Sequence, residues 1–382
     1  MRLEWQIVFW IGALLLLVLA LWLVSGVLLP FAAAVALCYL LNPVADRLEH
    51  LGLNRLGATL LIMAAFILIL ALIVILVIPI LWHQLASFIQ ALPAYVVKIE
   101  ELVTKLSERL PQDNGATLLE RFGFGKDASA DLRNSTSELV NQAAQWAGTF
   151  LKSVWTSGAA LIGVLSLLVV TPVVAFYMLL DWRKMIATID GLVPLRYRQT
   201  VRELAREIDA ALAGFLRGQS LVCLFLGIWY GAGLSLIGLN FGLLIGISGG
   251  LLSFIPYVGS LTALVLSATV AIVQGWPEWR LLALALGVVL SGQFLEGNVL
   301  SPKLVGGSVG LHPVWLIFAL LAFGSLFGFT GLIAAVPLAA AAGVLLRFAV
   351  RRYRESHFYS ELGQPGSKIL IEAAAIPTDE RR

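Results

Sequence analysis

The sequence predicts an all-α polytopic membrane protein, and three observations support this fold class. Hydrophobic residues make up 59% of the 382 residues and charged residues only 13%, unlike a soluble globular domain. Apolar runs suited to membrane helices recur along the chain. One unit in the C-terminal half occurs twice. Together these observations predict about five or six full transmembrane helices and two inverted re-entrant helical hairpins, about eight to ten membrane segments, with a small helical extracytoplasmic domain.

The N-terminal region, residues 1–82, is expected to hold transmembrane helices. Its first apolar run lacks a signal-peptide cleavage pattern and is too long for a signal-peptide core, so it should remain as an anchor. Asn42 and Pro43 should end the second span, and Trp82 should anchor the third at the interface. The three expected spans are residues 7–24, 28–41 and 58–81.

Two further regions precede the repeat. Residues 83–150 are more polar, with apolar positions at helical spacing, which predicts an extracytoplasmic amphipathic helical domain. Residues 151–237 return to the membrane, and Pro172 should kink the first helix there. The elements expected in this second region are a span at 155–180, a cytoplasmic amphipathic helix at 196–217 and a span at 221–237.

The repeated unit occupies residues 238–346. Its copies begin at Gly238 and Gly310, and Gly259 and Gly331 follow 21 residues later in each. An apolar run of about 15 residues lies on each side of a Pro/Gly break, and such a helix reaches only about 23 Å, short of a bilayer core of about 30 Å. Each copy is therefore expected to be two helices that meet at a non-helical tip within the membrane.

These tips predict a solute-binding site, because non-helical backbone at membrane depth is tolerated only where protein buries it or where it lines a wet cavity. Alternatively, the glycines only allow close helix packing and the repeat is accidental. The candidate translocation residues at the two tips are Ser253, Pro256, Tyr257 and Gly259, then Ser325, Gly328, Thr330 and Gly331.

Basic residues predict the orientation of the chain. The loop at 181–217 and the tail at 347–382 are rich in Lys and Arg, whereas residues 83–149 carry more Asp and Glu. The positive-inside rule then makes the tail and both termini cytoplasmic and the polar domain external. With this orientation the two hairpins enter the membrane from opposite faces.

Glu296 lies in the apolar crossing between the two copies, one turn from Gln293 and near Asn298. A carboxylate in hydrocarbon is costly enough to require a partner or a wet cavity. Glu296 could therefore couple transport to a cation or a proton, or contact a solute. Alternatively, the crossing ends near Leu295 and Glu296 lies at the cytoplasmic interface beside Lys303.

Structural or gating roles are expected for Pro172 and four other residues. Pro302 should end the crossing. Asp181, beside Arg183 and Lys184, should cap a helix or form an ion pair. Arg217 and Gln219 enter the fifth span, where Arg217 could extend to lipid phosphates.

The sequence contains no Walker motif, Rossmann fingerprint, zinc-protease motif or nucleophile elbow. No enzymatic activity, cofactor, metal site or nucleic-acid partner is therefore expected. Cys38 and Cys223 both lie in apolar runs, where they should pack helices and not form a disulfide or a zinc site.

Several of these motifs together resemble the autoinducer-2 exporter family, whose members are also described as predicted permeases, over about residues 10–350. The resemblance implies a bacterial inner-membrane homo-oligomer that could be a pentamer, with hairpins that move as an elevator. Some members export autoinducer-2 and others are linked to sodium/proton exchange. Phe329 and Thr330 depart from the isoleucine-rich pattern expected at the second tip. The motifs are Leu40 to Pro43, Thr171 to Asp181, Arg217 to Gln219, Ile255 to Gly259, Glu296 to Pro302, Leu311 to Pro313, Phe327 to Gly331, and Val336 with Pro337.

The sequence and the resemblance predict a secondary transporter that exports a small polar metabolite or signal, of the autoinducer-2 type, by an elevator-like movement. The partners expected are the lipid bilayer, the solute, a coupling cation or proton, and further copies of the chain. One alternative is a sodium/proton antiporter. Another is a non-transporting membrane scaffold whose domain at 83–149 binds a partner.

Overall fold

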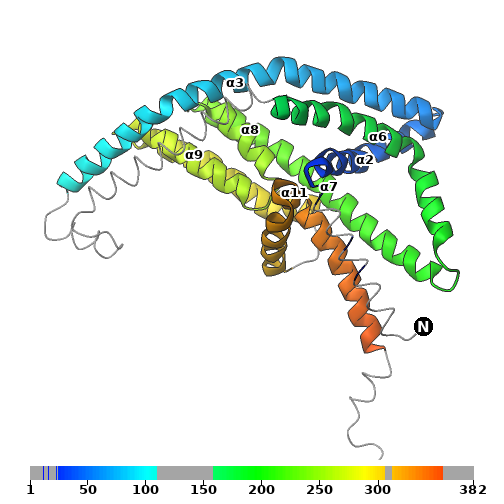
Figure 1. The fold of residues 1–382 in the computed structure, drawn as a ribbon. Helices are drawn as coiled ribbons and strands as arrows, with labels where there is room; N and C mark the ends of the chain where they lie inside the picture. The colour runs from blue at the N-terminus through cyan, green and yellow to red at the C-terminus, as the bar shows by residue number, and fades with distance from the viewer. Residues whose placement is uncertain are drawn as a thin grey trace, which may run out of the picture.

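The computed structural model describes residues 25–109, 158–305 and 312–355, with three isolated positions before residue 25. Over these ranges the chain forms helices and turns and no strand (Figure 1). Six of the described helices are long and apolar enough to cross a membrane. The predicted all-helical membrane class is confirmed. The expected first span, residues 110–150 of the expected polar domain and nearly all of the tail lie outside the described residues.

The helices form two groups. Helices α2, α3 and α6 pack mainly on one another, and we call them the scaffold; the helices from α7 to α11 form the core. The two groups meet where α2 contacts α7 and α11, and where α3 contacts α8 and α9. The elements are α2 (Ser25–His50), α3 (Arg55–Arg109), α6 (Gly158–Leu192), α7 (Arg198–Leu236), α8 (Gly242–Leu252), α9 (Val258–Gly275), α10 (Arg280–Leu295), the π-helix η1 (Glu296–Val305) and α11 (Pro313–Arg354).

Arg55, at the start of α3, joins the three scaffold helices. Its guanidinium donates to Asp46 at 2.9 Å and to the Asn42 side chain at 2.7 Å, both in α2. It also donates to the backbone carbonyl of Leu179 in α6 at 2.9 Å. Because the guanidinium is largely enclosed by its partners, these charge-assisted bonds fix the packing of the scaffold at one end.

Helices α2, α3 and α7 are longer than the sequence predicts, as are α6, which passes the expected end at residue 180, and α11, described below. Asn42 and Pro43 do not end helix α2, which continues to His50. Asn42 and Asp46, one helical turn apart, both accept hydrogen bonds from Arg55, and these bonds stabilise the longer helix. Helix α3 joins the expected third span to the start of the polar domain and, at 55 residues, is about 82 Å long. Helix α7 likewise joins the expected amphipathic helix at 196–217 to the fifth span.

Pro172 lies within α6, which continues to Leu192. The residue before it, Thr171, is buried, and its hydroxyl donates to the backbone carbonyl of Pro30 in α2 at 3.2 Å. This part of α6 is therefore fixed against the scaffold partner α2.

Helix α7 is the centre of the core, and glycines allow α8 to pack closely against it. A Cβ at Gly246 would lie 2.0 Å from the backbone nitrogen of Gly231, and a Cβ at Gly250 would lie 2.3 Å from the Cα of Gly227. Side chains at these positions would force the two helices apart, so the contact requires glycine. Residues of α7 spaced four apart form the centre of the buried cluster: Val222, Leu226, Tyr230 and Leu234.

Helices α8 and α9 pack together as a helical hairpin at the place where the sequence predicts the first one. The break falls between Leu252 and Val258, at the predicted tip, and Tyr257 takes a left-handed φ of 69°. At the open end, the Gln274 side chain donates to the carbonyl of Gly238 and accepts from the amide of Asn240, both at 2.8 Å. The hairpin is thus tied together at its base.

Helix α11 contains the second predicted break. Gly328 is non-helical, with φ 59° and ψ −138°, and separates residues 313–327 from residues 329–354. The two arms of α11 form a V (Figure 1). The second arm does not end near Leu346 as the repeat predicts, and at 26 residues it is about 39 Å long.

Candidate functional site

Three consecutive residues of α7, which we call the junction, contact three different elements. Arg217 bonds to α2 of the scaffold. A Cβ on Gly218 would lie 2.2 Å from the carbonyl oxygen of Leu304, so η1 packs directly on this position. The Gln219 side chain donates to the carbonyl of Ser253, at the tip of the first hairpin, at 2.5 Å. The scaffold, η1 and the first tip therefore meet on one turn of α7.

The first tip is tightly packed on its inner side. Ser253 is buried, and its hydroxyl donates to the carbonyl of Gly249 at 2.8 Å. A Cβ on Gly259 would lie 2.2 Å from the backbone nitrogen of Ser253, so the two arms cross at Gly259. Pro256 is half-buried in the break, whereas Tyr257 is 60% exposed. Tyr257 therefore offers an exposed polar side chain at this tip, while its backbone carbonyl accepts from the amide of Leu261.

The second tip repeats this crossing. A Cβ on Gly331 would lie 1.9 Å from the carbonyl oxygen of Phe323, so Gly331 plays the same packing role as Gly259. Ser325 is exposed, and its hydroxyl donates to a carbonyl of its own helix at 2.9 Å. Gly328 is also exposed, and Thr330 is half-buried.

Both hairpins pack against the same part of α7. Phe215 and Leu216, just before the junction, form a buried cluster with Val336 of α11, and Phe254 of the first tip packs on this cluster. Val336 lies about two helical turns beyond Gly328. The first hairpin therefore reaches this region with its tip, and the second reaches it with an arm.

Glu296 begins η1 and is half-buried. Gly292 packs under the Tyr230 ring, and Leu304 packs on Gly218, so α10 and η1 run antiparallel to α7. Glu296 lies between these two levels, about two helical turns from the junction. The structure places it within the core, on the helix that passes the first tip.

The crossing helix does not end at Pro302. Pro302 lies inside η1, whose wider turns move the carbonyl four residues earlier away from the proline ring. Gln293 is half-buried near the start of η1, whereas Asn298 is exposed and its amide donates to the carbonyl of Phe294 at 3.0 Å. π-Helical turns occur frequently at functional sites.

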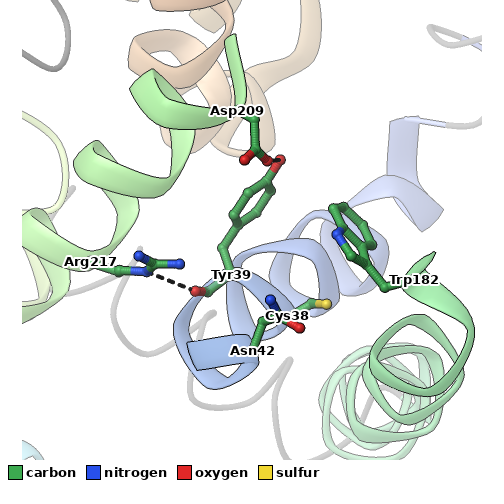
Figure 2. Close-up of a pocket in the computed structure, with 6 residues that line it drawn as sticks. All are labelled: Cys38, Tyr39, Asn42, Trp182, Asp209 and Arg217. Carbon is green, nitrogen blue, oxygen red and sulfur yellow. Dashed lines mark hydrogen bonds between the residues drawn. The ribbon is translucent and has the colours of Figure 1, made fainter. Parts of the chain in front are cut away.

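A polar cavity of about 50 Å³ lies between α2, α6 and α7, on the scaffold side of the junction. Figure 2 shows the Tyr39 hydroxyl meeting Asp209, to which it donates at 3.0 Å, and the Arg217 Nε donating to the Tyr39 carbonyl at 3.1 Å. Such a cavity holds no more than a few water molecules. In this conformation it links scaffold and core and is too small for a metabolite. Its lining is completed by Cys38, Asn42 and Trp182.

Asp181 forms the ion pair that the sequence suggested, with Lys184 at 2.9 Å. Sequence reasoning missed three polar residues: Tyr39 and Asp209, which bond to each other, and the buried Tyr230. Asp209 lies in an amphipathic pattern and reads as a solvated charge. Its spacing of eight residues from Arg217, about two turns along the same helix face, could have indicated a shared partner.

Comparison with known proteins identifies the family. The family model described as the AI-2E family transporter matches residues 11–351. The chain belongs to the AI-2E transporter family. YrrI of Bacillus subtilis (strain 168), named as a candidate transport protein, is 30% identical over 344 residues, which are 87% of this chain and 90% of YrrI. PerM of Escherichia coli (strain K12), named as a candidate permease, is 30% identical over 321 residues, which are 82% of this chain and 85% of PerM.

Membership of the AI-2E transporter family, together with six apolar helices, makes the chain a multi-pass membrane protein of a permease family. The match spans both the scaffold and the core. The junction, the two breaks and Glu296 therefore all lie within the region that this AI-2E member shares with its family.

Proposed function

We propose that this protein is a secondary transporter that exports a small polar metabolite or signalling molecule of the autoinducer-2 type. The convergence of two broken helix pairs on one segment of α7 is the observation that carries the proposal. Paired breaks of this kind supply unpaired backbone groups for a polar solute. The accessible groups at the tips include Tyr257, Ser325 and the backbone around Gly328.

An elevator-like movement of the core fits the way the helices pack. Contacts are dense within the scaffold and within the core, and sparser between them. A core that packs mainly on itself can move as a body when its few links to the scaffold break. In this mechanism the hairpins enter the membrane from opposite faces and carry the solute past α2 and α3.

The same proposal includes the environment of the protein. The chain would lie in a bacterial inner membrane with both termini in the cytoplasm, as the basic loop and tail favour. Many apolar side chains of α3 are exposed, including Leu68 and Ile75. Such a surface is suited to contact with lipid or with other copies in a homo-oligomer, such as a pentamer.

Flux through purified protein in liposomes tests the proposal. Vesicles with the wild-type chain should release autoinducer-2 down its gradient, and protein-free vesicles should not. Glu296→Gln should reduce the flux at least about tenfold if it removes one charge-assisted contact. The matched control is Glu278→Gln, at the Trp-rich end of the first hairpin. Equal flux in wild-type and empty vesicles would reject export of this solute, and unchanged flux in Glu296→Gln would remove Glu296 from the site.

A second candidate function is sodium/proton antiport, and the position of Glu296 within the core favours it. An antiporter that depends on one titrating carboxylate must show ion flux that changes with pH. Sodium uptake driven by an imposed proton gradient measures this activity in the same vesicles. Sodium flux that is independent of pH would exclude the antiporter.

A further inference from the structure

Tyr230 is an exception within the apolar core of this protein. Its side chain is fully buried, and its hydroxyl has no hydrogen-bond partner among the described residues. Buried hydroxyl groups nearly always have a partner, because an unsatisfied one costs about 1–3 kcal/mol. A buried phenol without a partner therefore points to a group that is absent or that has moved.

Glu296 is positioned to be that group. A Cβ on Gly292 would lie 3.0 Å from the Tyr230 hydroxyl oxygen, so the phenol lies on α10 one helical turn before Glu296. Glu296 also interacts electrostatically with Tyr230 and with Cys223, which lies two turns earlier on α7. Glu296 is thus near both side chains, at the contact of η1 with α7, without bonding to the Tyr230 hydroxyl.

The surroundings favour a proton over a metal cation as the ligand. Metal cations bound without water need several oxygen ligands, and the described residues contain no group of three or more His, Cys, Asp or Glu suited to a metal. The titratable groups of the described helices that face Glu296 are Cys223 and Tyr230, both from α7. Lys303 is exposed in η1, and Arg280 lies at the far end of α10.

We propose that Tyr230 and Glu296 form a proton-binding site in the core. When Glu296 takes a proton from water, its neutral carboxyl group turns toward Tyr230, and the phenol donates a hydrogen bond to the carboxyl carbonyl oxygen. When Glu296 releases the proton to water, the half-buried carboxylate turns away from the enclosed phenol toward water, because hydration stabilises its charge more than burial does, and the phenol loses its partner. The structure corresponds to the second arrangement, and Tyr230 acts as a positioning residue.

This inference deepens the proposed function by naming the coupled ion, so its test must not depend on flux. Infrared difference spectra of the full chain in lipid nanodiscs, recorded between acidic and neutral pH, show the carbonyl band of each protonated carboxyl group. The wild-type spectrum should contain a band that Glu296→Gln removes. Tyr230→Phe should keep this band but move it to higher frequency, because the carbonyl loses its donor.

Two controls separate this site from general effects. Tyr177→Phe changes a tyrosine that is 61% exposed on α6, and it should leave the band in place. Glu278→Gln should also leave it. If the spectrum of Glu296→Gln keeps every carbonyl band of the wild type, proton binding at Glu296 is overturned. An unchanged band in Tyr230→Phe would overturn the role of Tyr230.

A change of the metal cation in the buffer tests whether Glu296 binds a proton or a sodium ion. Replacing potassium by sodium at constant pH should leave the Glu296 band unchanged, and displacement of the proton by sodium would overturn a site reserved for protons. Autoinducer-2 flux in liposomes is measured separately. If the Glu296 band is present but autoinducer-2 flux is absent, the proposed export is rejected and the proton site stands. If flux is present but the band is absent, the proton site is rejected and the export stands.

Discussion

At the scale of single residues, glycine has two distinct functions in this chain. Gly328 is needed for its positive φ, which breaks α11. Gly259 and Gly331 are needed for space, since each lies where the backbones of two arms cross. The sequence predicts the importance of Gly259 and Gly331 because they stand at matching positions of the repeat, and that of Gly328 because it interrupts an apolar run. It does not separate backbone conformation from close packing, because that distinction depends on which chain segment lies opposite.

Alanine substitutions test the crossing glycines. Gly259→Ala and Gly331→Ala should each destabilise the fold by about 1–3 kcal/mol, because the added methyl group overlaps backbone atoms. Gly287→Ala is the matched control, since a Cβ there has no atom within 4 Å and alanine favours a helix. Thermal unfolding in detergent measures all three. A melting temperature for Gly331→Ala equal to that of Gly287→Ala would contradict the packing role.

Asp190 gives a prediction that depends on pH. It accepts hydrogen bonds from Arg202 and Arg198, which lower the pKa of its carboxyl group below the usual value. A depressed pKa stabilises the folded state above the unfolded pKa of about 3.9, and the contribution is lost as pH falls through the folded pKa. Asp190→Asn should therefore lower the melting temperature equally at pH 7 and pH 5.

Below about pH 4 the difference in melting temperature between wild type and Asp190→Asn should shrink. At these pH values the carboxyl group binds a proton in the unfolded wild-type chain while it stays charged in the folded chain, and this stabilises the unfolded state. Asp181→Asn is the control, since its ion pair with Lys184 is more exposed to solvent. Its effect on the melting temperature should be small at every pH. A difference for Asp190→Asn that grows on acidification would contradict the assignment.

At the scale of elements, the first hairpin is held at both ends by glutamine side chains. Gln219 binds the tip through the Ser253 carbonyl, and Gln274 binds the base through Gly238 and Asn240. Both contacts satisfy backbone groups that the hairpin leaves outside its helices. The tip is therefore held from α7, whereas the base is closed by the hairpin itself.

Hydrogen exchange can distinguish the two ends. Gln219→Leu should increase amide exchange in residues 253–259, because it removes the side chain that fixes the tip. Gln274→Leu should instead increase exchange in residues 238–242, where the Asn240 amide loses its acceptor. Each variant controls for the other in mass spectrometry of digested protein. A uniform increase along the hairpin in both variants would show that neither contact acts locally.

The element scale also shows what sequence patterns can predict. Pro256 and Gly328 interrupt apolar runs, so both breaks could be located before any coordinates. The ends of α2 and α7 could not be located from the sequence, because tertiary contacts override the local signals there. Arg55 binds the polar end of α2, and the residues of the junction lie in the middle of α7. The contacts of Tyr39 with Asp209 and of Gly292 with Tyr230 join distant segments, and no local pattern encodes them.

At the scale of the whole molecule, the scaffold and the core meet through few polar contacts. Tyr39 of α2 accepts a bond from Arg217 at its carbonyl and donates a bond to Asp209 from its hydroxyl. A core that moves against the scaffold must break both contacts. The hydroxyl bond can be removed without changing the backbone.

Tyr39→Phe should therefore shift the balance between scaffold and core arrangements. Loss of a bond worth about 1 kcal/mol corresponds to about a fivefold change in population. Spin labels at Leu51 in the scaffold and Leu236 in the core, both highly exposed, would report this as a broader distance distribution. Tyr177→Phe is the control and should leave the distances unchanged. Identical distributions in Tyr39→Phe and wild type would show that this contact does not hold the resting state.

The length of α3 has a mechanical consequence. Arg55 fixes one end of this helix to α2 and α6, while Gln84 binds the amide of Leu244 and Phe88 packs edge-to-face on Phe241, at the start of α8. These attachment points are separated by about 44 Å of helix. A tilt of only about 5° at the Arg55 end would displace the other by about 4 Å. Helix α3 can thus act as a lever arm. A small rearrangement of the Arg55 contacts with α2 and α6 would move the distant segment of α3 that holds the start of α8.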